Sequence, residues 1–333
     1  MKAATIVEPG KVVIEEKEKP HPEADEVLIR VEASGICGTD LHIFRGEYLG
    51  TYPIIPGHEG AGRIEEIGEK VQRFRKGDPV AFEPNLACDN CENCLNNRQN
   101  FCSNWDAIGV TLPGCMAEYV KVPEKNVFLT GGLDPEAAAF MEPLSCVLHG
   151  MQKTGIRPGD DVLILGAGPI GLQLLQVASS LGAAGLTVVE RIGTRAELTL
   201  ELGAGRVESD IGVLPKDAYD LVIDATGAIP LIESALDHVR YGGTVLLFGV
   251  APQGKTMNIE HFRIFRKGLK IVSSYTSLRN SFQAVETIRS GRVDVRRLVS
   301  HRFSLDDFEQ GLRLLGSGED GVKKVLVMPG MNK

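Results

Sequence analysis

The sequence predicts an α/β protein that combines a doubly wound, parallel-sheet domain with a second, β-rich domain. Residues 161–250 alternate continuous apolar strands with helices, a pattern typical of a parallel sheet that is covered on both faces. Residues before about 145 form short strands separated by Gly and Pro instead. The chain of 333 residues also has the length of about two domains.

The β-rich domain is assigned to residues 1–145 and 275–333. A strand is expected at Glu26–Ala33, and a further β-like run at 119–129. Asp134 and Pro135 are an N-cap and first-turn pair that predicts a helix start. Because Pro143 disfavours helical geometry at the preceding residue, a break is expected at Glu142.

The doubly wound domain is assigned to residues 146–274. Its strands are expected at 161–166, 186–190, 220–227 and 243–250, and its helices at 169–181, up to Gly203 and at 231–239. After it, the capping pattern from Ser304 to Asp307 predicts a helix start, and 323–328 is expected as a closing strand.

Composition and charge exclude several classes of protein. The chain is 43% hydrophobic and 24% charged, close to globular averages. Its formal charge of −8 has the wrong sign for a protein that binds nucleic-acid backbones. No apolar run approaches the roughly 18 residues needed to cross a bilayer, and Glu8, Pro9 and Gly10 interrupt the start. We expect a cytoplasmic protein without nucleic-acid or membrane partners.

A dinucleotide fingerprint lies between a predicted strand and a predicted helix. It consists of Gly166, Gly168 and Gly171 around Pro169 and Ile170, and Glu190 ends the next strand. These glycines permit a tight turn and a close approach of a pyrophosphate to a helix N-terminus, while a carboxylate at Glu190 accepts hydrogen bonds from a ribose. The alternative is an ordinary strand-turn-helix unit.

Four of the seven cysteines cluster in one polar loop, placed at about residues 84–105. Cys88, Cys91, Cys94 and Cys102 have the spacing C-x2-C-x2-C-x7-C, and four thiolates close a tetrahedral zinc shell, which is a structural site. A nucleic-acid zinc ribbon has similar spacing, but the flanks here are mostly acidic or neutral. Unpaired core thiols are the other alternative.

A third group of residues is dispersed along the chain. Cys37, His58, Glu59 and Glu142 lie in the segments GICGTDLH, GHEGAG and EPLS. Each one alone is more often structural than catalytic. Together with the dinucleotide fingerprint they supply a thiolate, an imidazole and a carboxylate, a zinc shell that leaves one position for water or substrate.

These motifs, in this order along the whole chain, resemble the zinc-dependent medium-chain alcohol dehydrogenase family, and within it the sorbitol and polyol dehydrogenase branch. The resemblance implies a GroES-like catalytic domain, a Rossmann domain, two zinc ions per chain, and NAD as cofactor, with NADP as the alternative. It also implies an alcohol or polyol substrate and a homo-oligomer, a tetramer or a dimer.

The resemblance assigns roles to individual residues. Cys37, His58 and Glu59 match the catalytic zinc ligands, and Glu142 matches a carboxylate that binds the zinc directly or through its water. Thr39 matches the hydroxyl that bonds the substrate oxygen, His42 a proton relay to solvent, and Asp40 a residue that orients His58. The expected cofactor-binding residues are Gly166, Gly168, Pro169, Ile170, Gly171, Glu190, Arg191, Arg195, Thr226, Gly249 and Val250.

Several alternatives stay open at this point. Cys115 is expected to be a buried core thiol, and Cys146 is a less suitable zinc ligand than Glu142. A zinc-free reductase on the same fold would lack Cys37 and His58, although both are present. Within the family, L-threonine, 2,3-butanediol, a glucose-type sugar or a simple alcohol are alternative substrates to a polyol.

Overall fold

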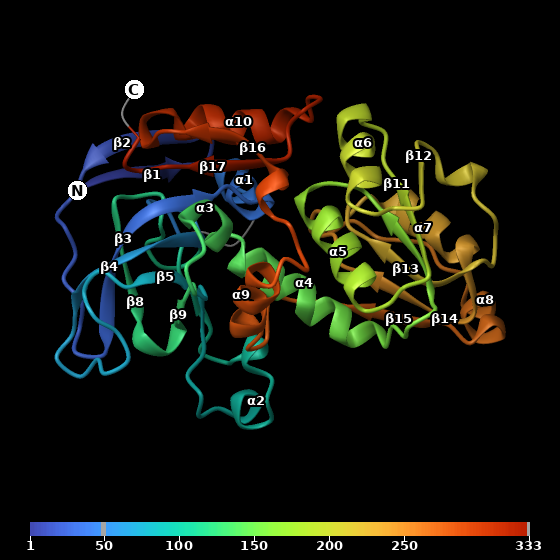
Figure 1. Cartoon of the computed structure of the whole chain (residues 1–333), viewed down its shortest axis with the longest axis horizontal. Coiled ribbons are helices and arrows are strands. Elements are labelled where there is room, and N and C mark those ends of the chain that lie inside the picture. Colours follow the sequence, from blue (N-terminus) through green and yellow to red (C-terminus); the bar gives the residue numbers. More distant parts are fainter. Residues whose placement is uncertain (48–50, 332–333) are drawn as a thin grey trace. The chain divides into compact units, whose positions relative to one another are not determined.

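The computed structural model describes residues 1–47 and 51–331, with the elements labelled in Figure 1. The chain divides into two compact units. The first comprises Met1–Ser145, Ser277–Gly291 and Val295–Lys333, and the second comprises Cys146–Thr276 and Arg292–Asp294. Residues 48–50 and 332–333 of the predicted β-rich domain lie outside the described residues.

A seven-stranded mixed sheet forms the centre of the first unit. Its strand order is β16-β17-β3-β4-β5-β9, and β8 also pairs with β3. Smaller two-stranded sheets join β1 to β2 and β6 to β7. The strands are β1 (Lys2–Glu8), β2 (Lys11–Glu16), β3 (Glu26–Gly35), β4 (Glu59–Ile67), β5 (Pro79–Phe82), β6 (Asn85–Leu86), β7 (Asp106–Ala107), β8 (Tyr119–Pro123), β9 (Val127–Leu129), β16 (Val299–Phe303) and β17 (Lys324–Val327).

Short helices surround this sheet. Helix α10 packs against β17 and α1, and Figure 1 shows α10 running alongside β16 and β17. Ser304 Oγ lies 2.7 Å from Asp307 Oδ2 at the start predicted for that helix. The helices are α1 (Gly38–Arg45), α2 (Glu92–Leu95), α3 (Pro135–Ala138), α9 (Ser281–Arg289) and α10 (Phe308–Ser317), with the 3-10 turns η1 (Gln99–Phe101), η2 (Glu124–Asn126), η4 (Arg296–Leu298) and η5 (Leu305–Asp307).

The predicted helix break at Glu142 is wrong. Helix α3 ends at Ala138, and α4 (Met141–Thr154) begins before Glu142 and includes Pro143. The backbone N–H groups of a first helical turn have no partner within the helix, so a proline there removes no hydrogen bond. The break therefore lies at 139–140, and Glu142 takes a fixed place in the first turn of α4.

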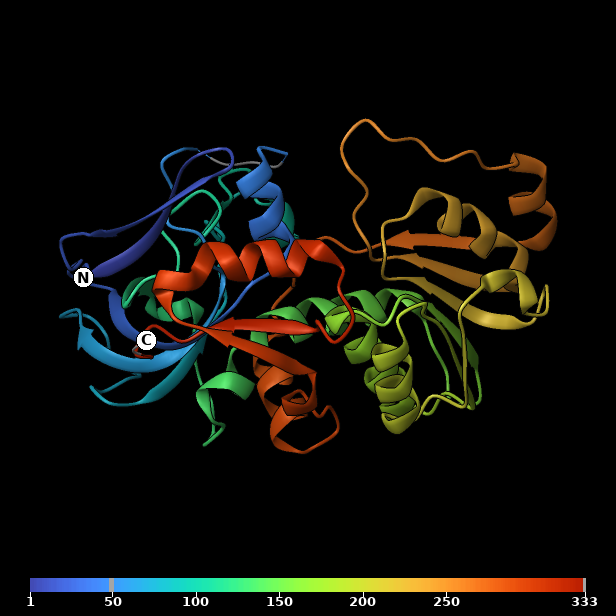
Figure 2. The same cartoon turned by 90° about the horizontal axis from the view of Figure 1, so that it is seen from above.

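The second unit is built on a six-stranded parallel sheet of order β12-β11-β10-β13-β14-β15. Helices α5 and α6 cover one face, and α7 and α8 cover the other (Figure 2). Leu163 and Leu165 on the central strand β10 are fully buried, because both faces of the sheet are covered. The strands are β10 (Asp161–Leu165), β11 (Gly185–Val189), β12 (Arg206–Glu208), β13 (Tyr219–Asp224), β14 (Val239–Leu247) and β15 (Lys270–Ser273).

The helices of this unit connect successive strands. They are α5 (Pro169–Ser180), α6 (Gly193–Glu201), α7 (Ile229–His238) and α8 (His261–Lys267), with the 3-10 turn η3 (Ile211–Val213). The chain thus contains one unit with a parallel sheet and one mixed, β-rich unit, which confirms the predicted fold class. Among the described residues, no helix has both the length and the apolar character needed to cross a bilayer.

Candidate functional site

Three of the predicted zinc ligands meet at one edge of the sheet in the first unit. Cys37 lies directly before α1, His58 lies directly before β4, and Glu59 is the first residue of β4. Strand pairing places Glu59 opposite Gly35, the last residue of β3. One ligand atom from each of Cys37, His58 and Glu59 lies within 4.8 Å of the others. A thiolate, an imidazole and a carboxylate fit a zinc ion with one open coordination position.

Asp40 holds two of these ligand segments in place. Its side chain is completely buried. Its Oδ2 accepts a hydrogen bond from the backbone N–H of Cys37 at 2.8 Å, and its Oδ1 accepts one from Gly57 at 3.2 Å. The Nδ1 atom of His58 lies 3.5 Å from the same Oδ1. Asp40 therefore connects the segments that carry Cys37 and His58.

The surroundings of His58 affect its protonation in the metal-free protein. Burial by itself lowers its pKa, but the negative groups of Asp40 and Cys37 raise the pKa of His58 well above its ordinary value. The Nδ1 of His58 and the Oε2 of Glu59 are both shielded from solvent. A metal ion at this site would release a proton from His58 as it binds.

The other predicted catalytic residues lie on helices of the same unit. Glu142 is 9% exposed, in the first turn of α4, and it is not part of the close group formed by Cys37, His58 and Glu59. Thr39 is half-buried on α1. His42, one turn further along α1, has its Nδ1 2.8 Å from Oε2 of Glu47, and its side chain is 32% exposed. His42 thus has access to solvent.

Sequence reasoning missed one charged residue at this site. Lys324, the first residue of β17, is buried with its Nζ against Oε2 of Glu59, and it donates a hydrogen bond to the backbone oxygen of Ile36 at 3.1 Å. Burial lowers the pKa of Lys324, but Glu59 and Cys37 outweigh this effect and raise it. The only signal in the sequence is a lysine directly before the apolar run Val325–Val327.

The four cysteines predicted as structural zinc ligands form a second group. One ligand atom from each of Cys88, Cys91, Cys94 and Cys102 lies within 4.8 Å of the others. The Sγ atoms of Cys88 and Cys102 are 3.5 Å apart. Backbone N–H groups, that of Ser103 first, lower the pKa of Cys91 to about 6, which favours the thiolate that binds zinc. Four sulfur ligands fit a closed structural zinc site.

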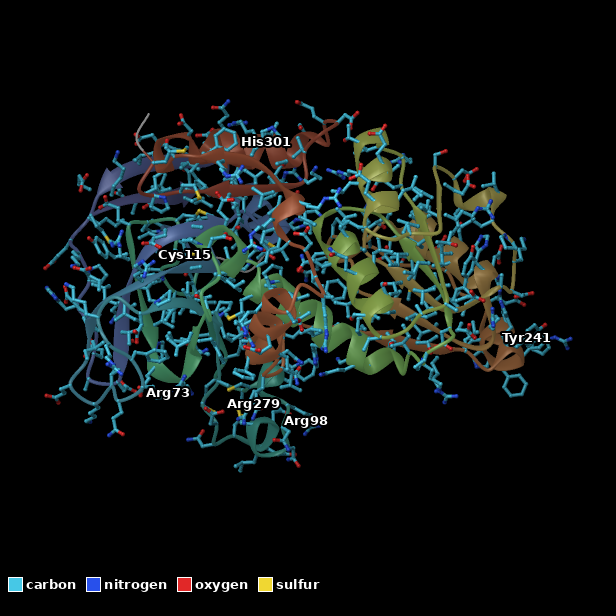
Figure 3. All side chains as sticks on the ribbon, in the orientation of Figure 1. Arg73, Arg98, Cys115, Tyr241, Arg279 and His301 are labelled. Carbon is cyan, nitrogen blue, oxygen red and sulfur yellow. The ribbon has the colours of Figure 1, made fainter. Side chains whose placement is uncertain are left out.

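Charged contacts hold this cysteine-rich loop against the rest of the first unit. Lys125 donates to Oδ2 of Asp89 at 2.7 Å and to the backbone oxygen of Ala87 at 2.6 Å. Arg279, in the segment before α9, lies 3.3 Å from Oδ1 of Asp89. Figure 3 shows Arg279 beside this loop and Arg98 within it. Asp89 therefore joins two distant segments to the predicted structural zinc site.

The other two cysteines considered in the sequence, Cys115 and Cys146, differ in their surroundings. Cys115, labelled in Figure 3, is 0% exposed in an apolar core cluster of the first unit, and its Sγ lies 3.0 Å from Ser34 Oγ. Burial raises the pKa of Cys115 to about 12, so this thiol is unreactive. Cys146, on α4, is half-buried. Among the described residues, neither belongs to a metal-binding group.

The dinucleotide fingerprint lies at the carboxyl end of β10, in the second unit. Gly166 follows β10 with a φ of 94°, a conformation that favours glycine. A Cβ atom on Gly171 would lie 1.9 Å from the backbone oxygen of Gly166, so only glycine fits there. Gly168 is the N-cap of α5, and Pro169 and Ile170 begin that helix. This loop presents a helix N-terminus to an anionic group.

The predicted ribose ligand, Glu190, follows the neighbouring strand β11. Its Oε2 accepts a hydrogen bond from the backbone N–H of Ala167, and its Oε1 accepts bonds from Arg191 and Ile192, all at 2.8–2.9 Å. An ionised carboxylate has about four lone-pair sites, so one remains for a ribose hydroxyl. Arg191 is exposed beside Glu190, and Arg195 is half-buried on α6.

The remaining predicted cofactor-binding residues follow β13 and β14. Thr226 donates its backbone N–H and its hydroxyl to Oδ1 of the buried Asp224 at 2.9 and 2.6 Å. Gly249 donates to the backbone oxygen of Asp224 at 2.9 Å, and Val250 is 72% exposed. These residues lie at the same edge of the sheet as Gly166, next to the point where the strand order reverses, where doubly wound sheets bind ligands.

Comparison with known proteins agrees with this geometry. Residues 23–131 match the alcohol dehydrogenase GroES-like domain, and residues 169–289 match the zinc-binding dehydrogenase family. D-altritol 5-dehydrogenase of Agrobacterium fabrum is 36% identical over 92% of this chain and 94% of its own length. D-arabinitol dehydrogenase 1 of Uromyces fabae is 31% identical over 99% of this chain and 97% of its own length.

A solved structure shows the same relationship in three dimensions. A protein of Sinorhizobium meliloti 1021, assigned as a zinc-binding dehydrogenase and solved with NADP, superposes with a TM-score of 0.93 at 35% identity, covering 98% of this chain and 99% of its own. The two family matches and these nearly full-length relatives agree with the observed fold. The chain therefore belongs to the zinc-dependent medium-chain alcohol dehydrogenase family and is an oxidoreductase that uses a nicotinamide cofactor.

Proposed function

We propose that the protein oxidises a polyol or vicinal diol at a secondary carbon, transferring hydride to NAD and forming a ketose or hydroxyketone. The observation that carries this proposal is the polar character of the metal site. Cys37 supplies one thiolate, and Glu59 and Glu142 supply buried carboxylates. Such surroundings suit a substrate with several hydroxyl groups. The two relatives named for D-altritol and D-arabinitol support the same substrate class.

Two zinc ions per chain belong to this proposal, each with its own task. Cys37, His58 and Glu59 would hold the catalytic ion, with Glu142 as a direct or water-mediated fourth partner. Cys88, Cys91, Cys94 and Cys102 would hold the structural ion. The catalytic ion supplies Lewis acidity that favours the alkoxide form of a bound alcohol near neutral pH.

The side chains of this protein supply the proton path. Thr39 would bond the reacting oxygen of the substrate and, as it accepts the substrate proton, pass its own hydroxyl proton on toward His42. His42 would exchange that proton with water, which its partly exposed position on α1 permits.

NAD is the proposed cofactor, because the carboxylate of Glu190 would repel a 2′-phosphate and accept a hydrogen bond from a 2′-hydroxyl. Arg191 is the feature that would favour NADP, since its guanidinium could pair with that phosphate. The homo-oligomeric state, as a tetramer or a dimer, remains a prediction. So does the cytoplasmic location.

A panel of alcohols, assayed by NADH absorbance, tests the substrate class. We expect D-sorbitol, xylitol, arabitol or 2,3-butanediol to give a higher kcat/KM than ethanol, 1-butanol, L-threonine or glucose. A site built to pair several hydroxyls rejects an analogue without them, because its buried polar groups are left unsatisfied. The highest kcat/KM with a monohydric alcohol or L-threonine would refute the polyol proposal while the dehydrogenase assignment stands.

A further inference from the structure

Lys324 brings a buried positive charge from the C-terminal strand to the predicted catalytic zinc site. Strand β17 pairs antiparallel with β3, with Leu326 opposite Gly35, which places Lys324 beside the ligand segments. The side chain of Lys324 is 5% exposed and that of Glu59 is 2% exposed. The ammonium group thus has a carboxylate and a backbone oxygen as partners in place of water.

The ion pair of Lys324 and Glu59 fits into the space that Gly35 leaves open. A Cβ atom on Gly35 would lie 2.0 Å from Oε2 of Glu59 and 2.7 Å from Cε of Lys324. The pair therefore occupies the space that any other residue at position 35 would need. On another side, the Nζ of Lys324 lies 5.9 Å from the centre of the Phe140 ring. A buried ion pair that loses one partner leaves an uncompensated charge, which is strongly destabilising.

The negative groups around Lys324 are the same groups that would face a bound zinc ion. Cys37, Glu59 and Glu142 are the negative groups that interact with Lys324. A zinc ion held by Cys37, His58 and Glu59 would be a second positive charge facing the same groups. Lys324 and the metal ion would both stabilise the carboxylate of Glu59, and they would repel each other.

We propose that Lys324 is a positioning residue that holds the carboxylate of Glu59 in place when the metal is absent and competes with zinc for it. Each cation then reduces the stabilisation that the other gives to the carboxylate of Glu59. This is a negative coupling between Lys324 and the metal. The proposal rests on the proposed zinc site at Cys37, His58 and Glu59. It concerns metal affinity and stability rather than the choice of substrate.

The test compares Lys324→Met with the parent protein, using zinc alone as the probe. We expect the metal-free variant to melt at a lower temperature than the metal-free parent, and zinc to raise its Tm by more. In chelator competition, the catalytic site of Lys324→Met should bind zinc about tenfold more tightly, within the range of typical coupling energies. Subtracting the zinc bound by Cys37→Ser isolates this site from the four-cysteine site.

Two controls separate this role from a general effect of losing a lysine. Lys323→Met changes the neighbouring, half-buried lysine and should leave both the zinc affinity and the metal-free Tm near the parent values. Lys324→Arg keeps the positive charge and should recover most of the metal-free stability. If Lys324→Met binds zinc more weakly than the parent, or responds to zinc as Lys323→Met does, the proposal is wrong.

A double-variant cycle keeps the test decisive if Lys324→Met does not fold without zinc. Glu59→Gln removes the negative partner, so Lys324→Met in that background should be more stable without metal than Lys324→Met alone. If the double variant is equally unstable, the pairing with Glu59 is not the cause and the proposal fails. A parent protein with two zinc ions but no dehydrogenase activity would instead refute the proposed function and leave this coupling intact.

Discussion

The carboxylate of Glu190, at the end of β11, accepts a hydrogen bond from the backbone N–H of Ala167, 2.8 Å away in the glycine-rich loop after β10. The residue predicted to bind the ribose therefore also fixes the loop predicted to bind the pyrophosphate. Its two oxygens accept three backbone hydrogen bonds in total. Removing this carboxylate should affect both the choice of cofactor and the shape of the loop.

We expect Glu190→Ala to weaken the binding of NADH more than that of NADPH, so the relative use of NADP rises. NADH loses a ribose partner, whereas NADPH also loses a repulsive charge. Fluorescence titration of both reduced cofactors measures the two Kd values. Comparable kcat/KM for NAD and NADP in the parent protein would show that Arg191 offsets the effect of Glu190.

Asp40→Asn should lower zinc affinity or kcat by about 10- to 100-fold, a usual effect for residues that orient metal ligands. The reason is that Asp40 accepts hydrogen bonds from Cys37 and Gly57 and lies beside His58. Metal analysis and steady-state kinetics measure the two effects. Parent-like zinc content and kcat in this variant would mean that the ligand segments hold their positions without the carboxylate.

Cys91→Ser should loosen the four-cysteine loop and lower the Tm, because a structural zinc ion contributes on the order of 10 kcal/mol to folding. The variant should lose one zinc ion per chain and become sensitive to proteolysis near residues 84–105. Cys146→Ser is the matched control, since Cys146 belongs to neither metal-binding group among the described residues. A Cys91→Ser protein as stable as this control would exclude a structural zinc at the loop.

His149 gives the protein a pH-dependent stability. Burial, followed by the charge of Lys153, lowers the pKa of His149 from 6.5 to about 4, and its buried Nε2 has no hydrogen-bond partner among the residues that the structure describes. Between these pH values the unfolded chain binds a proton that the folded chain does not. His149 therefore reduces stability as the pH falls from about 6.5 to about 4.

Replacing His149 by Gln removes this proton uptake. We expect the Tm of His149→Gln to fall less steeply than the parent Tm over the same pH interval, measured by calorimetry at several pH values. Comparing slopes corrects for any constant change in stability that the substitution causes. Parallel slopes for the two proteins would mean that His149 titrates normally in the folded state.

The sequence predicted those parts of the fold that depend on local patterns. The continuous apolar runs of β10 and β13 and the glycines after β10 identified the parallel sheet and its ligand-binding edge. The break assigned to Glu142 was wrong because a proline was treated as a helix breaker, although a first turn accepts it. Only the structure shows that α4 begins at Met141 and includes both Glu142 and Pro143.

The candidate site was predicted in part for a similar reason. Cys37, His58 and Glu59 lie in short motifs with recognisable chemistry, so they were found from sequence. Lys324 was missed because its function depends on β17 pairing with β3, nearly 300 positions away. The bond from Ala167 to Glu190 joins two strand ends, and no local pattern encodes it. Long-range pairing, and not residue type, determines both contacts.

The proposed zinc at Cys37 would perform the chemistry, while the proposed zinc at the four cysteines would only support the fold. The most direct measurement is zinc content per chain, together with turnover of a polyol, for the parent and for Cys37→Ser. We predict two zinc ions and activity in the parent, and one zinc ion, a retained fold and no turnover in Cys37→Ser. An active parent with a single zinc ion, or a Cys37→Ser protein that keeps its turnover, would contradict the account.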